Sequence, residues 1–92
     1  MSTAATIEAK LRAAFDPVRL VIVDDSHRHA GHAGARPGGE THFRVEIVSA
    51  RFEGKPRVAR QRMVHDVLEE ELAGPIHSLS LRSFTPAEDP TR

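Results

Sequence analysis

Residues 42–48, HFRVEIV, alternate between apolar and polar side chains. Phe43, Val45 and Ile47 share one face, and the Arg and Glu between them share the other. A period of two residues is typical of a β-strand with one buried face and one solvated face. The segment therefore predicts a half-buried strand.

Two further elements precede this strand. Ile7, Leu11 and Phe15 recur at helical spacing, and a helix through them should end at Asp16-Pro17, because the residue before proline is disfavoured in the helical region. Residues 18–23, VRLVIV, are mostly β-branched and predict a buried strand. Because no helix separates the two strands, we expect them to form an antiparallel pair.

A helix and a strand follow. Pro56 suits the first position of a second helix, which should end before Gly74-Pro75, and residues 76–84 predict a third strand. The order of elements predicts an α+β fold, a two-layer sandwich with a three-stranded sheet. We assign residues 1–86 to a single domain and residues 87–92 to a flexible C-terminal tail.

Composition excludes several classes of protein. The 92 residues carry 13 Lys and Arg against 13 Asp and Glu, so the chain is not a globally basic nucleic-acid binder. It has no cysteine, hence no disulfide and no thiolate ligand. No apolar run approaches the ~20 residues of a membrane span, and the N-terminus lacks the features of a secretory signal. We therefore expect a cytoplasmic protein with no membrane partner.

The loop expected at residues 25–41 is long for a connection between adjacent strands. It is rich in glycine and contains His27, His29 and His32. Three imidazoles on such a backbone are a plausible nitrogen source for zinc, copper or iron. A solvated loop that happens to be rich in histidine is an equally good interpretation of these residues alone.

His77 opens the third predicted strand and shares its parity with Leu79 and Leu81. Its side chain is therefore expected to lean towards the face that those leucines cover, as a hydrogen-bonded residue at a strand end. Together with one loop histidine, it would give a metal only two nitrogen ligands. The other ligands would then have to come from another molecule.

A basic cluster surrounds the start of the second helix and comprises Lys55, Arg57, Arg60 and Arg62. Cations beside free helix N–H groups favour phosphate or a nucleic-acid backbone, although a solvated charged face is the simpler interpretation. No nucleophile elbow, phosphate loop or dinucleotide fingerprint is present. The adjacent Asp24 and Asp25 should point to opposite faces of a strand, so we do not expect an enzyme.

Several blocks together resemble the BolA family. They begin with Val23-Asp24-Asp25-Ser26-His27-Arg28-His29 and continue with residues 40–49, ETHFRVEIVS. Residues 51–54, RFEG, residues 60–64, RQRMV, and residues 76–79, IHSL, follow in the family's order. The resemblance covers roughly residues 7–86, and the combination is highly specific.

The resemblance implies a class II KH-like fold of order α-β-β-α-α-β. It also implies a heterodimer with a monothiol glutaredoxin that bridges a glutathione-supported 2Fe–2S cluster. The implied protein ligands are His77 and one loop histidine, best matched by His29, with His32 and His27 as alternates. The apo form would be a monomer or a weak homodimer. The implied role is trafficking of the cluster, or regulation by iron or redox state.

One position departs from the family pattern, since members commonly have His where this chain has Gln61. The departure leaves the implied loop ligands in place. We interpret the remaining histidines, His42 and His65, as structural or surface residues.

DNA binding through the basic cluster is the alternative function, because some members of the family are described as transcriptional regulators. The absence of a Gly-x-x-Gly clamp in the place where a KH domain uses it weighs against DNA binding. Simple zinc or copper binding by the loop ranks last.

Overall fold

The computed structural model describes residues 2–25 and 42–91. Helix α1 (Thr3–Phe15) precedes strands β1 (Arg19–Asp24) and β2 (His42–Val48). A 3-10 turn η2 (Ala50–Phe52), helices α2 (Arg57–Val67) and α3 (Glu69–Ala73), strand β3 (Ser78–Phe84) and a second 3-10 turn η3 (Pro86–Glu88) complete the order. The α+β prediction and the order α-β-β-α-α-β are confirmed.

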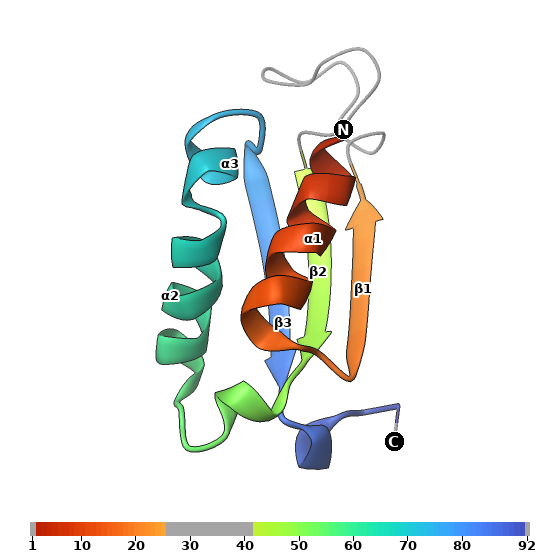
Figure 1. Cartoon of the computed structure of the whole chain (residues 1–92), viewed down its shortest axis with the longest axis vertical. Coiled ribbons are helices and arrows are strands. Elements are labelled where there is room, and N and C mark those ends of the chain that lie inside the picture. The colour runs from red at the N-terminus through yellow and green to blue at the C-terminus, as the bar shows by residue number, and fades with distance from the viewer. Residues whose placement is uncertain (1, 26–41, 92) are drawn as a thin grey trace.

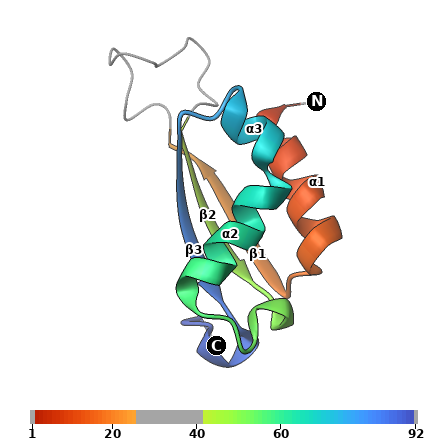
Figure 2. The ribbon, with the colours of Figure 1, turned by 90° about the vertical axis from the view of Figure 1, so that its left-hand side faces the viewer.

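The sheet has the order β1-β2-β3, so the alternating segment forms its central strand. β1 and β2 are antiparallel, as predicted, with Leu20 opposite Ile47, whereas β2 and β3 are parallel, with Val45 opposite Leu81. The helices cover one face of this sheet (Figure 1), and the view turned by 90° shows the two layers (Figure 2). The core therefore lies between the helices and one face of the sheet.

The core contains the residues that the two periodic patterns predicted. Ile7, Leu11 and Phe15 on α1 pack with the inward residues of β2, and the cluster is completed by Phe52, Val64, Leu68 and Ile76. The periodic spacing along α1 and β2 thus identified the two surfaces that meet.

Helix α1 has a defined start and end. It begins at a Ser2 cap, whose hydroxyl accepts from the Ala5 N–H at 3.1 Å. It ends at Asp16, which takes the left-handed conformation at φ 45° just before Pro17. Asp tolerates that region better than most residues, so the predicted stop at Asp16-Pro17 is confirmed.

The second predicted helix is interrupted at Leu68, whose backbone leaves helical geometry at φ −102°, ψ 20°. Leu68 itself has no exposed surface. After the break, Glu71 of α3 faces α1, where its carboxylate lies 2.8 Å from the Lys10 ammonium. The change of direction thus keeps Leu68 in the core and brings the buried carboxylate of Glu71 to the Lys10 ammonium. Pro56 caps α2 rather than occupying its first turn.

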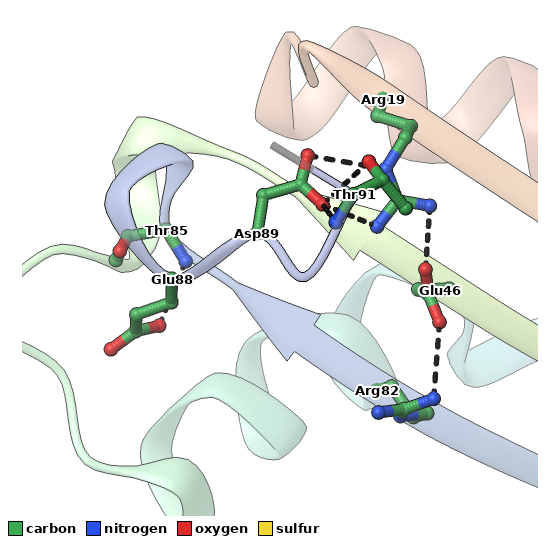
Figure 3. A network of polar contacts seen from close by, with 7 residues as sticks. All are labelled: Arg19, Glu46, Arg82, Thr85, Glu88, Asp89 and Thr91. Carbon is green, nitrogen blue, oxygen red and sulfur yellow. Dashed lines mark hydrogen bonds and ion pairs between the residues drawn. The ribbon is translucent and has the colours of Figure 1, made fainter.

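Residues after β3 contact the body of the domain. Asp89 accepts from the Arg19 guanidinium at 2.8 Å (Figure 3), and Glu88 accepts from Arg60 at 2.7 Å. The hydrogen bond from Arg60, with one from the Thr85 backbone, lowers the pKa of Glu88 to about 2. The hydrogen bond from Arg19 likewise lowers the pKa of Asp89 to about 2. The expectation of a flexible tail from residue 87 did not anticipate these contacts.

These depressed pKa values predict acid sensitivity. The two carboxyls have ordinary pKa values of 3.8 and 4.5, so their contribution to stability is complete above that range and is lost as pH falls through about 2. We expect the melting temperature to decline across this window. The double variant Glu88→Gln, Asp89→Asn should show a flatter decline, and equal slopes for the two proteins would contradict the assignment.

Candidate metal centre

His77 lies in a bend between α3 and β3, immediately after the buried Ile76. The side chain of Ile76 enters the core, whereas His77 is exposed. The expectation that His77 leans into the leucine face was therefore wrong, because β3 begins only at Ser78 and strand parity does not extend back through the bend. His77 instead stands at the surface at one end of the sheet.

His42 lies beside His77. The two rings are nearly parallel, with centroids 6.2 Å apart and an interplanar angle of 17°. His42 opens β2, next to Ser78 of the parallel strand β3, and its carbonyl accepts from the Asp25 N–H at 2.7 Å. Sequence reasoning assigned His42 only a structural or surface role. The signal that would have found it is the parallel register of β2 and β3, which pairs residues distant in the chain.

The predicted loop ligands His29, His32 and His27 lie outside the described residues. The two described residues on either side of residues 26–41, Asp25 and His42, are hydrogen-bonded to one another at the same end of the sheet as His77. Ligation by His77 together with a loop histidine stays a prediction.

The His42–His77 pair brings two potential nitrogen ligands to one end of the sheet, with ring centroids 6.2 Å apart. Because the lone pairs of imidazole lie in the ring plane, near-parallel rings do not by themselves aim both nitrogens at one ion, and ligation by this pair stays a prediction. Within residues 2–25 and 42–91, no group of three or more His, Cys, Asp or Glu side chains gathers as a metal site. The described residues thus place two imidazoles near one another without a third such donor beside them.

The basic cluster divides into two kinds of residue. Arg60 is engaged within the fold: its side chain is 12% exposed, donates to Glu88 and to the Lys55 carbonyl, and lies 5.9 Å from the Phe52 ring centre. These contacts disfavour its use as a ligand for an external anion. Lys55, Arg57 and Arg62 are exposed, and anion binding by them stays a prediction.

In the described part of the chain, no helix has the length and apolarity needed to cross a bilayer. The cytoplasmic location expected from the sequence stays a prediction.

Comparison with known proteins gives a consistent family. Residues 11–88 match the family model of BolA-like protein. A Sinorhizobium protein encoded in the cobS 5′ region is 47% identical over 100% of this chain and 99% of its own length. BOLA1, a chloroplastic protein of Arabidopsis thaliana, is 48% identical over 97% of this chain and 57% of its own length. The DNA-binding transcriptional regulator BolA of Escherichia coli strain K12 is 48% identical over 86% of this chain and 71% of its own length.

Solved structures agree with these relatives. BolA1 from Arabidopsis thaliana superposes with a TM-score of 0.86 at 43% identity, covering 98% of this chain and 99% of that one. The BolA domain of SufE1 from the same plant also gives 0.86, at 44% identity, covering 97% and 98%. The chain spans little more than half the length of the chloroplastic BOLA1 sequence, so that likeness concerns the shared domain.

Proposed function

This chain belongs to the BolA-like protein family, and from that premise we propose that it is a non-enzymatic adaptor for iron–sulfur clusters. In this proposal it pairs with a monothiol glutaredoxin and co-ligates a glutathione-supported 2Fe–2S cluster through histidines. The observation that carries the proposal is the His42–His77 pair, with ring centroids 6.2 Å apart at one end of the sheet.

The donor chemistry of the chain supports this role. Without cysteine, it offers imidazole nitrogens rather than thiolates. A 2Fe–2S cluster held partly by histidine has a higher reduction potential than one held by four cysteines. Because the described residues offer only two nearby imidazoles, the remaining ligands would come from the partner and glutathione. The chain would thus complete a shared site rather than hold a cluster alone.

We assign one ligand to His77 and leave the second to a direct comparison. His29 is the loop ligand that the family resemblance favours, with His32 and His27 as alternates. The structure adds His42, since its ring centroid lies 6.2 Å from that of His77. All four candidates are histidines. Replacing them one at a time therefore shows which one the cluster needs, while the other histidines stay in place.

Reconstitution tests the proposal. The purified chain is mixed with a monothiol glutaredoxin, iron, sulfide and glutathione, and the product is followed by visible circular dichroism and native mass spectrometry. We expect a 1:1 complex whose spectrum differs from that of the glutaredoxin homodimer. If the wild-type chain leaves the glutaredoxin spectrum and mass unchanged, the adaptor role is wrong.

DNA binding is the second candidate, favoured by the exposed Lys55, Arg57 and Arg62 and by the name of the Escherichia coli relative. We expect any such binding to be weak, because the formal net charge of the chain is zero, and to fall with salt, because it would rest on contacts with phosphates. The double variant Arg57→Glu, Arg62→Glu should abolish it in fluorescence anisotropy with duplex DNA. The control is Arg12→Glu, which reverses the charge of an exposed arginine on α1, outside the basic cluster.

A further inference from the structure

The face of the sheet opposite the helices carries a groove. The strand register aligns Val21, Glu46 and Arg82 in one row across the sheet. It aligns Val23, Arg44 and Ser80 in the next row. These two rows line a hollow of about 260 Å³, which we call the outer groove. One wall is apolar and the other is polar, and both valines remain partly exposed.

The groove lies on the same face of β2 as His42. Side chains alternate along a strand, so His42, Arg44 and Glu46 of β2 share this face. Successive residues on one face are about 7 Å apart, which places Arg44 one step from His42. At its other end, the groove meets the Arg19–Asp89 contact that holds the C-terminal segment (Figure 3). The groove therefore lies along β2 between His42 and the contact that holds that segment.

The arginines of the groove differ from Arg19. Arg19 is 22% exposed and pairs with both Glu46 and Asp89. Arg44 is 53% exposed and lies 3.7 Å from Asp25, and Arg82 is 63% exposed and lies 3.4 Å from Glu46. These longer, more exposed pairs leave guanidinium donors able to meet further carboxylates, because each guanidinium carries five N–H groups.

We propose that the outer groove docks the protein that completes the histidine site, through partner carboxylates at Arg44 and Arg82 and an apolar side chain against Val21 and Val23. This inference rests on the proposed function and names the surface that the partner uses. A standard interface covers ~800 Å² of each protein, so one that includes His42 extends over neighbouring residues such as Arg44. A partner that presents carboxylates would be repelled on the α3 side by the exposed Glu69 and Glu70.

The test compares charge changes on the two faces of the domain. Arg44→Glu and the double variant Arg44→Gln, Arg82→Gln are titrated with a monothiol glutaredoxin, both cluster-free and after reconstitution, by isothermal calorimetry and native mass spectrometry. Arg12→Glu, at an exposed arginine of α1 on the helical face and outside the basic cluster, is the matched control. We expect the groove variants to bind roughly tenfold or more weakly and the control to bind within about twofold of wild type. Melting temperatures verify that each variant is folded.

The possible outcomes separate the two proposals. If wild-type protein forms no complex, the adaptor role fails and this docking surface fails with it. If wild type binds and the groove variants bind equally well, only the docking surface is wrong. Loss of self-association without loss of glutaredoxin binding would assign the groove to a second copy of this chain and would also overturn the proposal.

Discussion

Replacing His77 with alanine should abolish the cluster spectrum of the complex with a monothiol glutaredoxin. His77 is exposed at the end of the sheet, and its ring lies beside that of His42. Removing its imidazole takes away a nitrogen ligand that no cysteine in the chain can replace. The measurement is visible circular dichroism during reconstitution, in which the spectrum should revert to that of the glutaredoxin homodimer.

The other histidines supply a negative control and the candidates for the second ligand. His65→Ala should leave the spectrum unchanged, because His65 is exposed on α2, away from the sheet end. His42→Ala and His29→Ala then identify the second ligand, since only the true ligand should reproduce the loss seen at His77. If neither does, His32→Ala and His27→Ala are the next substitutions. An unchanged spectrum for His77→Ala would contradict the assignment of this residue.

Stability measurements distinguish loss of a ligand from loss of the fold. Because His77 is exposed, its substitution should change the free energy of unfolding by no more than about 0.5 kcal/mol. Urea denaturation of the apo protein gives this value. A large destabilisation would mean that His77 supports the fold, and the spectral loss would then say nothing about ligation.

Local patterns predicted most of the fold. The alternation at residues 42–48 identified β2 and its buried face, and the spacing of Ile7, Leu11 and Phe15 identified the buried side of α1. The apolar spacing continues through Leu68 and so did not reveal the break there, whereas the family resemblance implied two helices in this part of the chain. The Lys10–Glu71 contact that accompanies the break joins residues distant in sequence.

The candidate site was less predictable, for the same physical reason. The family resemblance predicted His77 as a ligand, but its proximity to His42 depends on the register between two parallel strands. Sequence reasoning grouped Arg60 with a surface cluster because its partner, Glu88, lies in a segment whose composition suggested flexibility. Pairings across the sheet and to the C-terminal segment are not encoded in local periodicity.

Substitution of Phe52 should cause the largest loss of stability in the domain. Phe52 has no exposed surface, and its ring packs against that of Phe15 with centroids 5.1 Å apart. Phe→Ala changes in cores typically cost ~3–5 kcal/mol, and small domains are stable by only ~5–15 kcal/mol. We therefore expect Phe52→Ala to lower the free energy of unfolding, measured in urea, by roughly a third or more.

The matched controls separate lost volume from lost surface contacts. Phe52→Leu keeps much of the apolar volume and should cost clearly less than Phe52→Ala, whereas Val58→Ala, at a residue 56% exposed, should cost under about 0.5 kcal/mol. Phe52 also lies under the Arg60 guanidinium that holds Glu88, so the alanine variant should weaken the hold on the C-terminal segment. Its melting temperature should then depend less on pH between about 2 and 4.5 than that of wild type. A cost below about 1 kcal/mol for Phe52→Ala would show that this part of the core is not closely packed.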